Sequence, residues 1–255
     1  MKQIESMSNP RIQEVRRILK RGNKKLFLLE GKKLLQEAMQ SDVSIRDLFL
    51  TKAVLQKERQ WIRKFENSGC TINIIDPSLL KVISDVETPA GIVAIALRPE
   101  SGKWHAPKSF AALLYSVRDP GNFGTIVRSA EAAGCEFLIH TYDCVDPFQP
   151  KAVRASSGSV FRVPLFEIRN TGETLQDCRN QGVRLCALTP AGGISIFQTK
   201  PMFPAILLIG SETKGLPDDI AVDEKIRIPM SGRVESLNTG AAATIALYWL
   251  AGQIR

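Results

Sequence analysis

Hydrophobic positions in the first part of the chain alternate between short β-branched runs and longer runs with helical spacing. Strand patterns occupy residues 26–30, 47–51, 71–75 and 92–96. Helical patterns begin at Pro10, after the capping residue Asn9, and span 32–39, 54–67 and 79–83. Alternation of this kind predicts an α/β domain with a mostly parallel sheet.

The second part of the chain repeats the alternation over longer apolar strands. Strands are expected at 111–117, 136–141, 160–166, 183–188, 205–210 and 226–230. Helices are expected at 122–133, about 149–157, 172–181, 217–222 and 238–252, the last with Asn238 as N-cap. This part is again predicted to be an α/β domain.

A polar stretch separates the two parts. Residues 98–108 carry two prolines, a glycine and few apolar side chains, which is typical of a linker. The predicted organisation is a domain at 1–98, a linker at 99–108 and a second domain at 109–255.

The net charge of +8 is concentrated near the start of the chain. Residues 1–64 hold 16 Lys and Arg against 7 Asp and Glu, whereas the rest is close to neutral. Phosphate neutralisation makes a basic lobe typical of RNA binding, although a solvated face would have the same charge. The candidate RNA-binding residues here are Arg11, Arg16, Arg17, Lys20, Arg21 and Lys32.

The composition argues against export, membrane insertion and metal binding. The chain starts without the apolar core of a signal peptide, and no apolar run approaches the roughly 18–20 residues of a membrane span. Its five cysteines are scattered without a C-x-x-C pair, so neither a disulfide framework nor a zinc site is indicated. His105 and His140 are too far apart in the sequence to suggest a catalytic pair. A reducing cytoplasm is the expected location.

Three stretches combine a buried strand with a loop of small or polar residues. They are residues 117–134, 207–217 and 226–248. The first contains Gly121 and Gly124 as G-x-x-G, which lacks the G-x-G-x-x-G spacing of a dinucleotide-binding turn, so an oxidoreductase is disfavoured. The last starts a helix with small residues at 240–243, which let another group pack very close, although tight packing of the helix on a sheet is the simpler explanation of this stretch alone.

Taken together, in this order and at these separations, the three stretches resemble the signature motifs of the SpoU/TrmH family of RNA ribose 2′-O-methyltransferases, within the SPOUT superfamily. The resemblance is close over residues 109–255 and looser over 1–98. It implies that the C-terminal domain is an α/β knot, in which the last helix is threaded through a loop to make a trefoil. A smaller RNA-binding α/β domain would precede it. It also implies S-adenosylmethionine as cofactor, no metal, and a homodimer in which an arginine of one subunit serves the cofactor of the other.

The resemblance assigns roles residue by residue. Arg128 would contact the substrate, and because a guanidinium is difficult to deprotonate, stabilising the developing alkoxide is favoured over acting as a base. Glu212 would hold its loop and the arginine, and Asn122 would lie at or near a helix N-cap. The implied catalytic residues are Arg128, Asn122, Glu212, Ser236 and Asn238. The implied cofactor-binding residues are Gly210, Ile228, Met230, Leu237 and Thr189. At Gly210, the lack of a side chain would let the backbone approach the cofactor.

Two details qualify this carry-over. The family commonly continues its third motif with valine and serine, where this chain has Thr239 and Gly240. A further similar segment, residues 151–158, makes Arg154 a candidate phosphate contact, with a solvated helix face as the alternative.

Ribosomal RNA is the expected substrate, because the basic first lobe resembles those of ribosomal RNA modifiers. A tRNA methyltransferase and a non-catalytic RNA-binding or assembly factor are the alternatives.

Overall fold

The computed structural model describes residues 1–102, 104–234 and 236–254, so Lys103 of the expected linker lies outside the described residues. The chain forms two compact units. Unit 1 comprises Met1–Pro99 together with Phe148–Phe161, and unit 2 comprises Glu100–Pro147 together with Arg162–Arg255. Segment 148–161, which was expected to belong to the second domain, therefore packs with the first.

Unit 1 is built around a five-stranded sheet in the order β1-β4-β3-β5-β2. Its elements are β1 (Lys2–Ile4), α1 (Pro10–Arg21), β2 (Leu26–Glu30), α2 (Lys32–Gln40), β3 (Ile45–Leu50), α3 (Lys52–Lys57), α4 (Arg59–Asn67), β4 (Thr71–Ile75), α5 (Pro77–Ile83), β5 (Ile92–Leu97), α7 (Pro150–Ser156) and the 3-10 helix η1 (Ser159–Phe161).

The sheet of unit 1 is mixed. Strand β5 lies between β3 and β2 and is antiparallel to both, whereas β1, β4 and β3 are mutually parallel. The prediction of a mostly parallel sheet is therefore wrong for unit 1, whose sheet contains both parallel and antiparallel strand pairs. Alternating strands and helices specify the connections but not the direction in which β5 enters.

The core of unit 1 explains why α1 forms where it does. Asn9 caps the helix by accepting a hydrogen bond from the Arg11 amide, and Pro10 occupies the first turn. Ile12, Val15 and Ile18 recur at helical spacing and are buried with residues of β2, β4, β5 and α5. Burying this stripe leaves the basic residues between them on the outside of the helix.

Unit 2 contains a seven-stranded sheet in the order β10-β12-β9-β11-β6-β7-β8. All its ladders between described strands are parallel, and the α/β alternation predicted for this part is confirmed. Its elements are β6 (Phe110–Leu114), α6 (Pro120–Ala133), β7 (Leu138–Thr141), β8 (Leu165–Ile168), α8 (Thr171–Asn180), β9 (Arg184–Leu188), β10 (Ile194–Ser195), β11 (Ala205–Ile209), β12 (Glu224–Arg227) and α9 (Thr239–Ala251).

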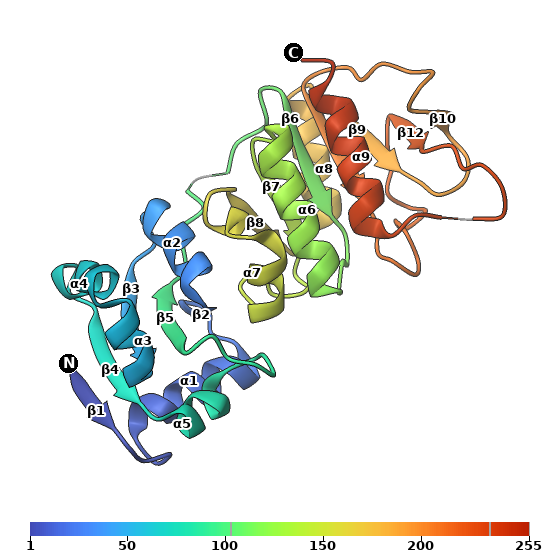
Figure 1. Cartoon of the computed structure of the whole chain (residues 1–255). Coiled ribbons are helices and arrows are strands. Elements are labelled where there is room, and N and C mark those ends of the chain that lie inside the picture. Colours follow the sequence, from blue (N-terminus) through green and yellow to red (C-terminus); the bar gives the residue numbers. More distant parts are fainter. Residues whose placement is uncertain (103, 235, 255) are drawn as a thin grey trace. The chain divides into compact units, whose positions relative to one another are not determined.

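Helices α6 and α9 lie side by side in unit 2 (Figure 1). Small residues permit this approach, since a side chain on Gly240 would come within 3.2 Å of Thr125. The Ser129 and Thr244 hydroxyls also share a hydrogen bond of 2.7 Å. The bare first turn of α9 therefore packs closely against another helix, α6, whereas the sequence had suggested tight packing on a sheet.

Several predicted elements differ from those observed. Residues 217–222 form turns instead of a helix, and the strand expected at 160–166 is instead η1 followed by β8. The helix expected at 54–67 is divided at Glu58 into α3 and α4. The short strands β1 and β10 were not predicted, because two or three residues are too few for a periodic pattern.

Candidate active site

A cavity of about 660 Å³ opens beyond the carboxyl ends of three neighbouring strands of unit 2. The loops after β9, β11 and β12 line it, together with the start of α9. In open α/β sheets this edge is where ligands bind, and the volume lies within the roughly 300–1,000 Å³ of small-molecule sites. All five predicted cofactor-binding residues line the cavity, with two of the predicted catalytic residues: Thr189, Gly210, Ile228, Met230 and Leu237, with Glu212 and Ser236.

The residues present suit a molecule with apolar and polar parts. Half-buried Ile228, Met230 and Leu237 offer apolar surface. The 210–216 loop, which contains two glycines without side chains, lines the cavity together with Thr189, whose hydroxyl donates to the Ile226 carbonyl at 3.2 Å. An adenosine joined to a charged amino-acid chain fits this combination.

Gly210 is required for a reason different from the one expected. A Cβ on Gly210 would overlap the Gly215 carbonyl carbon and lie 2.6 Å from its oxygen. The loop is closed at this point by two hydrogen bonds of 3.1 Å between the backbones of Ser211 and Gly215. The missing side chain therefore permits the loop to fold back on itself, so close approach of a cofactor is not needed to explain the glycine.

A chain of hydrogen bonds joins residues from all three sequence motifs. The Asn122 side-chain amide donates to Glu212 Oε1 at 3.0 Å, and the Asn238 amide donates to Asn122 Oδ1 at 2.8 Å. Asn238 also caps α9, as predicted, since its Oδ1 accepts from the Ala241 amide. Asn122 is thus fixed from both sides.

The residue that caps α6 was missed from the sequence. The helix begins at Pro120, its N-cap is Asp119, and Asn122 is its third residue. The Asp119 carboxylate accepts from the Asn122 amide at 2.8 Å, while the Asp119 amide donates to Glu212 at 3.4 Å. An aspartate directly before a proline is a sequence signal for this cap.

Arg128 stands apart from these contacts. It is exposed on α6, it does not line the cavity, and no hydrogen bond or ion pair joins its side chain to another residue in the described part of the chain. The expected pair of Glu212 with Arg128 is therefore not formed, and Glu212 instead holds Asn122. Ser236 is exposed at the cavity.

The candidate RNA-binding residues of unit 1 divide into two groups. Four basic side chains lie along a hollow on α1 that Pro10, Gln13 and Glu14 also line: Arg16, Arg17, Lys20 and Arg21. The other candidates are engaged within unit 1. Lys32 is paired with Glu58 at 2.6 Å, and Arg154 with Asp85 at 2.8 Å.

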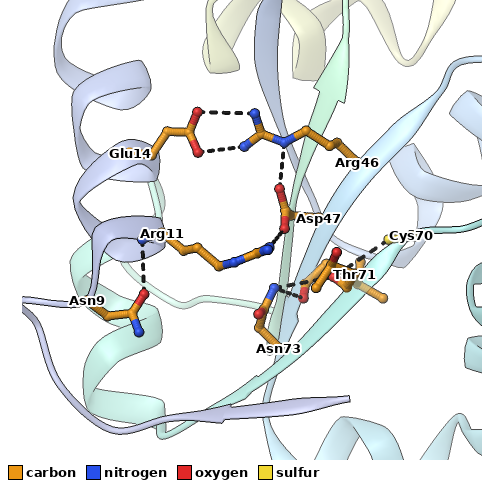
Figure 2. A network of polar contacts seen from close by, with 9 residues as sticks. Asn9, Arg11, Glu14, Arg46, Asp47, Cys70, Thr71 and Asn73 are labelled. Atoms are coloured by element: carbon orange, nitrogen blue, oxygen red, sulfur yellow. Dashed lines mark hydrogen bonds and ion pairs between the residues drawn. The ribbon is translucent and has the colours of Figure 1, made fainter.

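Arg11 is engaged in the same way, as Figure 2 shows. Its guanidinium pairs with the buried carboxylate of Asp47, whose other oxygen accepts from Arg46 at 2.6 Å. Arg46 in turn makes two hydrogen bonds with Glu14. Both Arg46 and Asp47 of β3 are therefore paired with residues of α1 (Figure 2). A charge buried without its partners is costly, so this arginine has a structural use.

Histidines and cysteines take no part in the cavity. His140 is buried against Phe123, and burial lowers its pKa, while His105 is exposed. The five cysteines are free thiols. Within the described ranges, no cluster of His, Cys, Asp or Glu could hold a metal ion, and no helix has the length and apolar content to cross a membrane.

Two family models match the chain, over different ranges of residues. Residues 109–248 match the model of the SpoU rRNA Methylase family. Residues 9–94 match the model of the MRM3-like substrate binding domain.

Comparison with individual proteins gives similarity over almost the whole chain. It is 29% identical to the 23S rRNA (guanosine(2553)-2′-O)-methyltransferase RlmP of Bacillus subtilis, covering 99% of this chain and 100% of that protein. It is 31% identical to the 23S rRNA (uridine(2479)-2′-O)-methyltransferase of Streptomyces viridochromogenes, covering 94% and 88%. The crystal structure of an AdoMet-bound rRNA methyltransferase from Sinorhizobium meliloti matches with a TM-score of 0.84 and 29% identity, covering 100% and 98%.

Proposed function

Because the chain belongs to the SpoU rRNA methylase family, we propose that it transfers a methyl group from S-adenosylmethionine to a ribose 2′-hydroxyl of ribosomal RNA. The observation that carries this proposal is the hydrogen-bonded chain of Asn238, Asn122 and Glu212 beside the cavity. It assembles polar groups from three distant stretches next to a space of cofactor size. S-adenosylmethionine, when bound, supplies an activated methyl group on a sulfonium centre.

The residues of the chain then position the ribose and stabilise charge. Asn122 is held rigidly by Glu212 and Asn238, so its position is set before RNA arrives. Ser236 presents a hydroxyl at the cavity, where it can orient the ribose. The Arg128 guanidinium stabilises the negative charge that develops on the 2′-oxygen as its proton passes to water.

The apolar residues Ile228, Met230 and Leu237 hold the adenosine end of the cofactor in this proposal. Thr189, on the loop after β9, and the loop that begins at Gly210 contact the polar end of the cofactor. Calorimetry with S-adenosylmethionine tests the assignment. Ile228→Glu, which places a carboxylate in the cavity, should weaken binding strongly. Unchanged affinity in that variant would place the cofactor elsewhere.

The substrate assignment rests on the two full-length relatives, which both act on 23S rRNA but at a guanosine in one and a uridine in the other. The class of RNA is therefore inferred, and the nucleotide must be mapped. A 2′-O-methyl group protects the adjacent phosphodiester from alkaline cleavage, because the attacking hydroxyl is blocked. Ribosomal RNA from a strain lacking the gene should lose protection at one position, and Arg128→Ala should not restore it. An unchanged cleavage pattern in both rRNA and tRNA would favour the non-catalytic alternative.

RNA is bound in this proposal mainly through α1, where Arg16, Arg17, Lys20 and Arg21 are available. Arg11, Lys32 and Arg154 contribute less directly, since each is already paired with an acid. Phosphate contacts supply affinity that falls steeply with salt.

A homodimer is the proposed assembly. Exposed Ile245 and Tyr248 give α9 apolar surface that unit 2 does not cover, and the exposed Arg128 has no acidic partner in the described part of its own chain. We expect Arg128 to act at the cofactor site of the partner subunit. Arg128→Ala and Ile228→Glu should each be inactive, but mixed dimers should regain activity at one of their two sites. Inactive mixed dimers, after verified subunit exchange, would show that Arg128 acts in its own subunit.

Two further proposals concern the knot, which family membership implies, and the location of the protein, which is argued from its thiols. We expect the segment before α9 to pass through a loop of the chain, which brings Leu237 beside the loops after β9 and β11. Stretching the chain from both ends would give a contour length shortened by the tightened knot, and full length would contradict it. Free thiols suit a reducing cytoplasm, which fractionation of a tagged chain would test.

A further inference from the structure

The turn between β6 and α6 has a strained backbone. Ser116 adopts a φ of 55°, in the left-handed region that residues with a side chain rarely occupy. The residue is also buried, so the strain is not relieved by solvent. Such conformations persist only where surrounding contacts hold them, and they concentrate at functional sites.

The carboxylate of Asp143 holds this strained residue. The Ser116 hydroxyl donates to Asp143 Oδ2, and the Ser116 amide donates to the Thr141 hydroxyl at 2.9 Å. That hydroxyl in turn donates to Asp143 Oδ1 at 2.6 Å. Both carboxylate oxygens are therefore used to fix the backbone and the side chain of Ser116.

The residues after Ser116 are held by the same segment. The Val117 amide donates to Cys144 Sγ at 3.3 Å, and the Val117 carbonyl accepts from the Val145 amide at 3.0 Å. Arg118 reaches Asp143 Oδ2 at 3.4 Å. The conformation of the whole turn therefore depends on its contacts with residues 141–145.

These contacts continue without a break into the candidate active site. The next residue, Asp119, caps α6 through the Asn122 amide, and its own amide donates to Glu212. The direction in which α6 starts therefore sets where Asn122 meets Glu212. It also sets where Arg128, further along the same helix, is presented.

The charge of Asp143 suits this use. Burial raises its pKa, but hydrogen bonds from Ser116, Thr141 and Arg118 outweigh that effect and hold the pKa below its ordinary value. The group is therefore an ionised acceptor at neutral pH, and an ionised acceptor makes stronger hydrogen bonds than a neutral one.

We propose that Asp143 is a positioning residue for methyl transfer, which acts by holding Ser116 in its strained conformation and thereby orienting the start of α6. Asp143 touches neither Asn122 nor the lining of the cavity. Its effect is transmitted through the backbone of residues 116–119. The inference rests on the proposed function for its kinetic test, and on the structure alone for its test by hydrogen exchange.

The decisive experiment separates holding the backbone from general stabilisation. Asp143→Asn keeps the shape of the side chain but replaces one acceptor oxygen with a donor nitrogen. It should lower kcat by about ten- to a hundredfold through misplacement of the helix start, with the Kd for S-adenosylmethionine nearly unchanged. Amide exchange over residues 116–119 should become faster.

Glycine at position 116 provides the rescue. Because glycine adopts positive φ without strain, the turn no longer needs Asp143. The double variant Ser116→Gly with Asp143→Asn should return kcat to within about threefold of Ser116→Gly alone. Ser116→Ala with Asp143→Asn loses the same hydroxyl but keeps the strain, so it should remain slow. Asp177→Asn, an exposed acid on α8, controls for the change in charge.

Two results would overturn the proposal: an Asp143→Asn variant with normal kcat and normal exchange, or a loss of activity that Ser116→Gly rescues no better than Ser116→Ala. A wild-type protein that transfers no methyl group would instead contradict the proposed function. In that case exchange at residues 116–119 still decides whether Asp143 holds the turn.

Discussion

At the scale of single residues, Gly210 shows how one missing side chain determines the shape of a binding loop. The loop turns back so tightly that Gly215 lies where a Cβ of residue 210 would be. The cavity wall formed by 210–216 therefore depends on a contact within the loop itself. A side chain at this position would therefore change the shape of the cavity wall directly, and would affect ligand binding through that change.

We therefore expect Gly210→Ala to reduce both stability and cofactor binding. Overpacking against backbone should cost about 1–3 kcal/mol, and the displaced loop should weaken the affinity for S-adenosylmethionine. Gly172→Ala is the matched control, because its Cβ would meet only Asn170 Oδ1, at an ordinary 3.7 Å. Thermal unfolding and calorimetry measure both effects. A Gly210→Ala protein with normal stability and weakened binding would restore direct cofactor approach as the reason for the glycine.

Cys135 gives a prediction for pH dependence. Burial raises the pKa of this thiol from its ordinary value of 9.0 to about 12 in the folded protein. Between these values the unfolded chain releases a proton that the folded chain keeps. The free energy of unfolding should therefore fall as the pH rises above 9.0, by about 1.4 kcal/mol per pH unit from this thiol.

Urea unfolding of wild type and Cys135→Ala between pH 8 and about 10.5 measures this contribution. The wild type should lose stability more steeply with pH, and the difference in slope belongs to Cys135. Parallel curves for the two proteins would show that the thiol already ionises in the folded state.

At the scale of elements, α1 combines two sets of arginines with different uses. Arg11 serves the buried Asp47, whereas Arg17 and Arg21 are exposed on the same helix and have no such partner in the described part of unit 1. Charge alone could not separate these sets in the sequence. The separation depends on which residues β3 brings beneath the helix.

Paired substitutions should separate the two uses. Arg17→Gln and Arg21→Gln should weaken RNA binding and reduce its salt dependence, with little change in stability. Arg11→Gln should instead lower the stability of unit 1 by about 1–3 kcal/mol, because Asp47 loses a charged partner. RNA affinity as a function of salt and thermal unfolding give the two measurements. Equal losses of RNA affinity in all three variants would return Arg11 to the RNA-binding surface.

Much of the element order follows from the sequence, because caps and apolar periodicity are local signals. The strands 26–30 and 71–75 were predicted to the residue, and Asn9 and Asn238 were identified as caps. The direction of β5 and the membership of segment 148–161 depend on contacts between distant residues, which a periodic pattern does not record. In the candidate site, the residue types were available from motif resemblance, but their partners were not. Glu212 meets Asn122 because the loop after β11 lies beside the start of α6.

At the scale of the whole molecule, the two units are not separable by one cut in the chain. The chain leaves unit 2 after Pro147, forms α7 and η1 within unit 1, and returns at Arg162. Within unit 1, Phe27 packs against Phe148 at 5.0 Å and against Phe161 at 5.7 Å between ring centroids. Val153 and Val160 of this segment are buried as well.

Deleting residues 1–98 should therefore give a protein that aggregates instead of a monodisperse methyltransferase domain. The deletion removes Phe27 and leaves Phe148 and Phe161 without their aromatic partner, on a segment that no longer has a core to join. The same deletion with Phe148→Ser and Phe161→Ser should be more soluble and should retain S-adenosylmethionine binding, because the residues that line the cavity all belong to unit 2. Size-exclusion chromatography and calorimetry compare the two proteins. If the simple deletion is monodisperse and binds the cofactor, the segment finds enough contacts without unit 1, and the boundary predicted at residue 98 is adequate for separating the units.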